Sequence, residues 1–199
     1  MLKYGWVVVT LIWTGCMSVN KEITAHREQY KSDFLHDERS PLKEADLVNL
    51  DFYPPLKSAK VRAKFKLTPT EEPFELPTYS GITRTYRKYG VATFLWEGDS
   101  TSLALYQNMT LFSNPAYKDY LFLPFKDETN GTETYGGGRY LNMSKEDTAD
   151  GQITIDFNKA YNPWCAYSEG FNCPIPPVEN HLDFPVLAGE RQYKGEVKH

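Results

Sequence analysis

The sequence lacks an apolar segment long enough to cross a membrane and lacks a strong cluster of basic residues. A transmembrane helix needs about 20 apolar residues, whereas the uncharged run from Tyr4 to Trp13 has ten. The densest basic stretch, Arg84 to Lys88, holds three positive charges in five residues, and the chain has a net charge of −4. Because phosphate binding depends on clustered Lys and Arg, we expect no nucleic-acid partner.

Metal ligands are also scarce. The chain has three cysteines and four histidines, and it has no second Cys or His pair at the spacing that structural zinc sites use. We therefore expect no metal and no cofactor. A site built from scattered acids and one histidine stays open as an alternative, with the candidate ligands Asp156, Glu179, His181 and Glu190.

The N-terminus has the pattern of a secretory signal. Met1-Leu2-Lys3 is followed by the short apolar core, and Thr14-Gly15 places small residues directly before Cys16. This arrangement is typical of bacterial lipoproteins, in which the cysteine receives a lipid before cleavage. Trp13 departs from the usual pattern, which has Leu three residues before the cysteine. An ordinary signal peptide with a chance cysteine, or an uncleaved anchor, are the alternatives.

This interpretation divides the chain into three parts: a signal peptide over residues 1–15, a tether over 16–22 and a single domain over 23–199. It places the domain in the bacterial cell envelope, attached to the membrane through a lipid on Cys16. Met17 follows the cysteine in place of Asp, which favours the outer membrane under the enterobacterial sorting rule.

Sequence periodicity predicts a mainly β domain with two N-terminal helices. Apolar residues recur at helical spacing from Lys21 to Leu35, and Ser40-Pro41 is typical of a helix start, with the helix ending near Leu50. Beyond Pro55 the period changes to two, which indicates seven or eight short strands separated by turns. Such strands form a β-sandwich or β-barrel. The predicted strands are Val61–Leu67, Thr83–Tyr89, Val91–Glu97, Ser102–Met109, Tyr120–Phe125, Arg139–Met143, Gln152–Phe157 and Leu182–Leu187, and Phe74 and Leu76 continue the apolar pattern after the first of them.

Two cysteines remain for the folded domain. In an oxidising compartment Cys165 and Cys173, which lie in one Pro-rich loop, would most simply form a disulfide. A pair of reduced, buried thiols is the alternative.

The last third of the chain is dense in Tyr, Asn, Pro and Gly. It contains Gly137-Gly138-Arg139-Tyr140, then Asp156-Phe157-Asn158, Ala160-Tyr161-Asn162-Pro163 and Cys165-Ala166-Tyr167, and finally Cys173-Pro174, Pro176-Pro177, Glu179-Asn180 and Ala188-Gly189-Glu190. These motifs resemble DUF1684, a bacterial and archaeal family of unknown function. His181 stands where that family usually has Arg. The resemblance implies a family but no activity.

The same segment supplies the candidate ligand site. Arg139 can clamp a carboxylate or form a structural ion pair with Asp156 or Glu190, and short polar side chains in loops commonly bond their own backbone. A polar loop that closes one end of a barrel and a polar pocket floor both fit this composition. The candidate binding residues are Arg139, Tyr140, Asp156, Asn158, Tyr161, Asn162, Tyr167, Glu179, Asn180 and Glu190.

Three functions follow as hypotheses. The first is a non-enzymatic envelope module that binds a small polar ligand or a protein partner through residues 134–190. The second is a hydrolase or thiol enzyme in which Cys165 or Cys173 is the nucleophile and His181 the base, oriented by Glu179 or Asn180. The third is a structural or assembly lipoprotein.

The lipid on Cys16 can be tested directly. When cells that make the wild type or Cys16→Ala are grown side by side with labelled palmitate, we expect label on the wild-type protein only, because the thiol is the attachment point. Equal labelling of both proteins would contradict the lipoprotein assignment.

Overall fold

The computed structural model describes the backbone of residues 11–199 and the side chains from residue 19 onward, except that of Ala149. Residues 1–10 of the predicted signal peptide and the side chain of Cys16 lie outside this part. The helical elements are α1 (Leu11–His36), α2 (Met109–Phe112) and the 3₁₀ turns η1 (Glu44–Asn49), η2 (Lys57–Ala59), η3 (Pro115–Tyr117), η4 (Lys145–Gly151), η5 (Phe157–Lys159), η6 (Trp164–Ala166) and η7 (Val178–Asn180). The strands are β1 (Lys60–Leu67), β2 (Phe74–Pro77), β3 (Thr83–Trp96), β4 (Asp99–Asn108), β5 (Tyr120–Phe125), β6 (Arg139–Ser144) and β7 (Gln152–Asp156).

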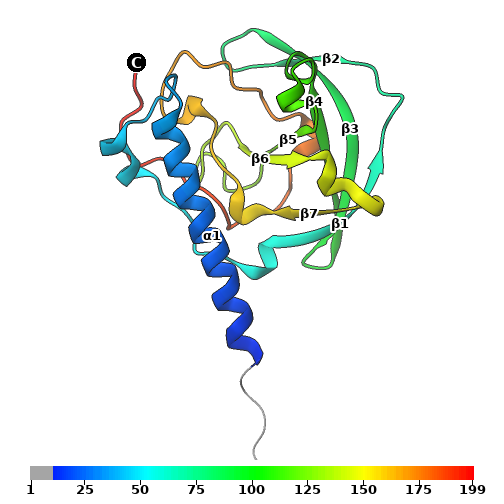
Figure 1. Ribbon diagram of the computed structural model, residues 1–199, viewed down its shortest axis with the longest axis horizontal. Helices are drawn as coiled ribbons and strands as arrows, with labels where there is room; N and C mark the ends of the chain where they lie inside the picture. The colour runs from blue at the N-terminus through cyan, green and yellow to red at the C-terminus, as the bar shows by residue number, and fades with distance from the viewer. Residues whose placement is uncertain (1–10) are drawn as a thin grey trace, which may run out of the picture.

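All seven strands belong to one antiparallel sheet that curls into a half-barrel (Figure 1). Its order is β6-β5-β4-β3-β1-β7, and β2 pairs with the first part of β3. The predicted mainly β fold is therefore confirmed. β6 and β7 are the two ends of this order and do not pair with each other, so the barrel remains open between them.

Both faces of the sheet are covered around the centre of β4, which explains why four successive residues, Leu103 to Tyr106, are apolar and buried there. Leu103 and Leu105 point to the main core inside the curl, while Ala104 and Tyr106 point to a second cluster on the other face. The main core is formed chiefly by Phe65, Phe94, Leu121, Leu123, Phe125, Leu141, Ile153, Ile155 and Phe157.

The two strands predicted on either side of Gly90 are one strand, β3, and that prediction was wrong. The register of β3 with β4 shifts between Lys88 and Gly90, which marks a β-bulge. The Phe65 ring occupies the space where a side chain at position 90 would lie: a Cβ on Gly90 would be 2.3 Å from the Phe65 Cζ atom. The glycine therefore bends the strand and does not end it.

The strand predicted over Leu182–Leu187 does not form. This segment is irregular, and Pro185 has no backbone N–H to donate to a sheet ladder. The carbonyl of Val186 accepts a hydrogen bond from the Arg139 guanidinium at 2.9 Å, and the ring of Phe184 stacks on Trp96 at 5.1 Å. These side-chain contacts, together with backbone hydrogen bonds from Leu182 to Lys126 and from Glu128 to Phe184, hold this segment in place without a regular strand.

Asn180 takes the place of missing sheet hydrogen bonds. β4 and β5 share one registered pair, Tyr106 with Phe122. Farther along these strands, the buried Asn180 side chain accepts from the Ala104 N–H at 2.7 Å and donates to the Ala104 carbonyl at 2.9 Å and the Pro124 carbonyl at 2.7 Å. One carboxamide thus joins two strands that have separated.

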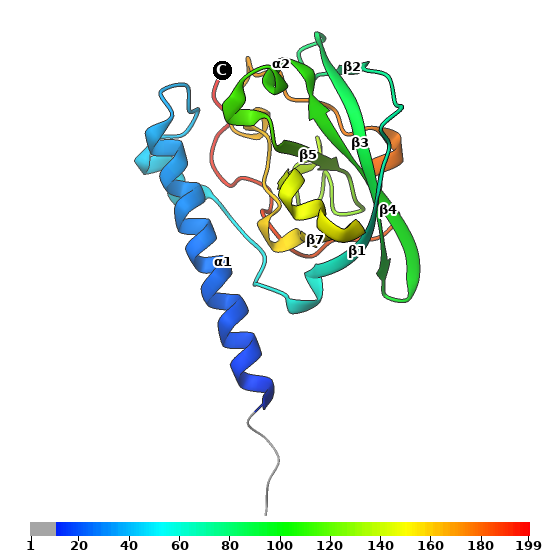
Figure 2. The same ribbon diagram turned by 45° about the vertical axis from the view of Figure 1, so that its right-hand side comes forward.

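Helix α1 is longer than predicted. It begins at Leu11 and runs without a break through residues 16–22, where a tether was expected. Its C-terminal half lies beside the barrel, and its N-terminal half projects beyond the sheet (Figures 1 and 2). Within the described residues, no helix is both long and apolar enough to span a bilayer.

The second predicted helix is a shorter 3₁₀ turn, η1, which starts at Glu44. Ser40 does not cap it, because the Ser40 hydroxyl donates to the Leu42 carbonyl at 2.9 Å and accepts from the Leu42 N–H at 3.2 Å. Instead the Lys43 N–H donates to the Asp46 carboxylate at 2.7 Å.

Cys165 and Cys173 form a disulfide that closes the loop after η6. Beyond β7 the chain contains 3₁₀ turns, irregular segments and isolated β-bridges, as the Pro-rich loop around the two cysteines predicts for that part.

Replacing Asn180 with Ala would leave three buried backbone groups without partners. Because each unsatisfied buried group costs about 1–3 kcal/mol, we expect the free energy of unfolding in urea to fall by about 3 kcal/mol or more. Val178→Ala, at a side chain that is 81% exposed, is the matched control and should change little. A similar, small effect of both substitutions would show that Asn180 does not join the strands.

Candidate functional site

Arg139, the strongest candidate from the sequence, is fully buried. Its guanidinium pairs with the buried Asp127 carboxylate at 2.7 Å and also donates to the backbone carbonyls of Val186, Ala188 and Glu190. The expected partner was a side chain of Asp156 or Glu190, and that expectation was wrong. Arg139 has no exposed donor, so its position fits the structural ion pair better than the carboxylate clamp.

The glycines before Arg139 serve packing. Gly138 has a positive φ of +91°, and a Cβ at this position would lie 2.6 Å from the Phe125 carbonyl oxygen. Only glycine fits a backbone that approaches its neighbour this closely.

Two asparagines of the motifs also bond backbone. Asn158 pairs with both the N–H and the carbonyl of Leu56, at 2.7 and 2.9 Å. Asn162 donates to the Arg191 carbonyl at 2.8 Å. These buried side chains satisfy backbone groups of irregular segments that have no strand partner, whereas Asn180 bonds two strands.

Glu190 lies at the centre of a buried hydroxyl network. Its carboxyl accepts from Tyr167 at 2.6 Å, from Tyr30 at 2.9 Å and from the Asn162 N–H at 2.8 Å, and the two tyrosine hydroxyls are 2.9 Å apart. When the carboxyl is ionised, both hydroxyls donate to it and no proton remains for the contact between the two tyrosines. When the carboxyl is protonated, it donates to one tyrosine and all three contacts have a proton. Burial raises the pKa of Glu190 to about 7, in agreement with this count.

Two other candidates lie apart from this network. Tyr140 packs in the second cluster and its hydroxyl donates to the Pro174 carbonyl. Glu179 accepts from Lys88 and from Tyr106, each at 2.6 Å. The sequence motifs therefore do not converge on one pocket.

Two adjoining pockets instead lie next to α1. The pockets, of about 240 and 280 Å³, share His26, Asn142 and Tyr161 and together form a groove between α1 and the open edges of β6 and β7. We call it the α1 groove. Its first pocket is lined by His26, Gln29, Tyr30, Asp33, Phe34, Asp37, Asn142, Tyr161 and Trp164, and its second adds Lys60, Leu141, Met143, Asp147, Thr154, Asp156 and Lys159.

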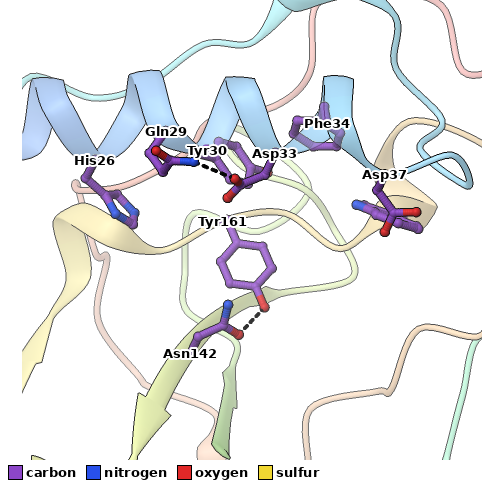
Figure 3. A pocket seen from close by; sticks show the side chains of 9 residues that line it. His26, Gln29, Tyr30, Asp33, Phe34, Asp37, Asn142 and Tyr161 are labelled. Carbon is purple, nitrogen blue, oxygen red and sulfur yellow. Dashed lines mark hydrogen bonds between the residues drawn. The ribbon is translucent and has the colours of Figure 1, made fainter. Parts of the chain in front are cut away.

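Figure 3 shows how two elements face each other across the first pocket. His26, Tyr30 and Asp33 extend from α1 toward Tyr161, whose hydroxyl donates to the Asn142 carbonyl oxygen at 2.6 Å. That oxygen also accepts from Tyr120 at 2.9 Å. The NH₂ group of Asn142 has no hydrogen-bond partner among the described residues, which leaves it available to a ligand.

The second pocket has mixed charge. Glu22 on α1 bonds to Lys159 at 2.9 Å and to Lys60 at 3.1 Å, and these lysines hold the pKa of Glu22 below its usual value. Lys60 also lies 3.8 Å from Asp156. Burial, followed by the charge of Lys159, lowers the pKa of His26, which favours its neutral form.

Two of the ten predicted binding residues, Asp156 and Tyr161, line the α1 groove. The residues that α1 contributes were missed, although His26, Tyr30 and Asp33 are at the spacing that places side chains on one face of a helix. Among the described residues, no group of three His, Cys, Asp or Glu side chains is arranged to hold a metal. Both candidate thiols are joined in the disulfide, so neither is a free nucleophile while that bond is intact.

Glu190 should make stability depend on pH. Its folded pKa of about 7 exceeds the unfolded value, so its contribution is complete below about pH 4.5 and is lost as pH rises through 7. Over this pH range the free energy of unfolding falls by about 3 kcal/mol through Glu190 alone. We expect Glu190→Gln to reduce the slope of the free energy of unfolding against pH between pH 5 and 8. Glu28→Gln, on the exposed side of α1, should keep the wild-type slope. An unchanged slope in Glu190→Gln would contradict the assignment.

Comparison with known proteins identifies the family. A solution NMR structure of an uncharacterised protein from Haloarcula marismortui is 33% identical, with a TM-score of 0.67, and the match covers 86% of this chain and 92% of that one. No curated protein matches the chain. Residues 45–191 match the family described as "Protein of unknown function (DUF1684)", and the chain belongs to this family.

Proposed function

We propose that this protein is a non-enzymatic binding module that holds a small polar ligand in the α1 groove. The observation that carries the proposal is the groove itself: two adjoining pockets open along the seam of the half-barrel, with the unpaired NH₂ of Asn142 beside aromatic walls. Ligand pockets commonly combine apolar walls with a few placed polar groups.

The buried residues of the motifs support a binding module over an enzyme. A catalytic group must reach its substrate, but Arg139, Asn158, Asn162, Asn180 and Glu190 are buried and bond to the protein's own groups. These side chains stabilise the folded domain on which the groove lies.

The location proposed for this module is the bacterial envelope, with a lipid on Cys16 as its membrane attachment. The disulfide between Cys165 and Cys173 suits an oxidising compartment. In this arrangement α1 connects the anchor to the groove, because it contains Cys16 near one end and the groove residues His26 to Phe34 near the other.

A thermal-shift screen tests the proposal. We expect at least one compound from a set of sugars, organic acids, amines and nucleosides to raise the melting temperature of the full chain, because ligands stabilise the state that they bind. The shift should be lost in the double variant Gln29→Ala, Asn142→Ala, whose side chains are exposed. Gln192→Ala, at an exposed position outside the groove, is the control. A shift that survives in the double variant would place binding elsewhere.

A further inference from the structure

The first pocket of the α1 groove is rich in aromatic rings. Tyr30 and Phe34 come from α1, while Tyr161 and Trp164 come from the opposite wall. The rings of Tyr30 and Tyr161 are 5.9 Å apart, and those of Tyr30 and Phe34 are 5.0 Å apart. Grouped aromatic faces are the surfaces that attract organic cations in proteins, because the face of each ring is negative.

Of the two carboxylates that line this pocket, one has no ion-pair partner among the described side chains. Asp37 pairs with Arg39 at 3.0 Å, and this guanidinium also lies over the Trp164 ring at 5.8 Å. Lys159 lies on the side of the second pocket, paired with Glu22. Asp33 accepts a hydrogen bond from Gln29 at 2.7 Å and forms no ion pair among the described side chains.

The hydrogen-bonding groups favour an alkylated ammonium over a primary amine. A primary ammonium carries three N–H donors that each need an acceptor. The carbonyl oxygen of Asn142 already accepts from two tyrosines, so the remaining side-chain amide and carboxylate oxygens, on Gln29, Asp33 and Asp37, all come from one wall of the pocket. A trimethylammonium group needs no acceptor. The free NH₂ of Asn142 then suits an oxygen elsewhere on the same ligand.

We propose that the first pocket binds a small alkylammonium compound that also carries an oxygen atom, with the cation between the aromatic rings and Asp33. The proposal rests on the proposed function, because it names the ligand class of the same groove. The pocket volume of about 240 Å³ suits a compound or head group of this size.

Choline and its neutral isostere 3,3-dimethyl-1-butanol form a matched pair of probes. They would be titrated into the ¹⁵N-labelled full chain in a maltoside detergent, while the indole N–H of Trp164 and the side-chain NH₂ of Asn142 are followed by NMR. Substitution of each residue assigns its signal. We expect choline to shift both signals and to bind about tenfold more tightly than the isostere, since the cation is the only difference.

Asp33→Asn tests the charge. Asp33 is exposed, so the variant should fold, and we expect it to weaken choline binding at least about threefold without changing the isostere. Glu28→Gln removes an equal charge from α1 outside the groove and should leave both affinities unchanged.

Equal affinity for the two probes, or equal effects of the two substitutions, would overturn the alkylammonium assignment. If choline shifts neither signal but another compound from the thermal-shift screen does, the ligand class is wrong and the proposed function stands. If no compound shifts either signal, both proposals fail.

Discussion

The buried ion pair between Arg139 and Asp127 is the interaction on which the rest of the architecture depends. Breaking such a pair leaves an uncompensated charge in the core, at a cost of about 3–5 kcal/mol. Here the guanidinium at the start of β6 also binds three carbonyls of residues 186–190. It therefore attaches the irregular C-terminal segment to the sheet. That segment carries Glu190, whose carboxyl binds Tyr30 and so joins α1 to the domain.

This chain of contacts explains how an open half-barrel can be stable. A sheet whose end strands do not pair exposes backbone donors and acceptors, and the fold covers the opening with α1 and the segment that follows β7. Asn158, Asn162 and Asn180 satisfy backbone groups that no strand reaches. The opening is incompletely filled, and the α1 groove is the space that remains between the helix and the two edges.

The sequence predicted most strands because alternation of apolar and polar residues is a local signal. It did not predict the single strand through Gly90, since the Phe65 ring that packs there comes from another strand. The polar motifs after β6 were recognised as dense, but their roles depend on distant partners such as Asp127 and Leu56. The groove was largely missed for the same reason: half of its first pocket lies on α1, far in sequence from Tyr161. Sequence spacing alone cannot bring these walls together.

The polar motifs stabilise the fold, and we propose that the α1 groove binds the ligand. Hydrogen exchange of the full chain, measured by mass spectrometry with and without a small-molecule extract of the source cells, tests this most directly. We expect slower amide hydrogen exchange in residues 26–37, 141–143 and 161–164, because a bound ligand restrains both walls of the groove. Slower exchange confined to residues 174–181, or no change anywhere, would contradict the proposal.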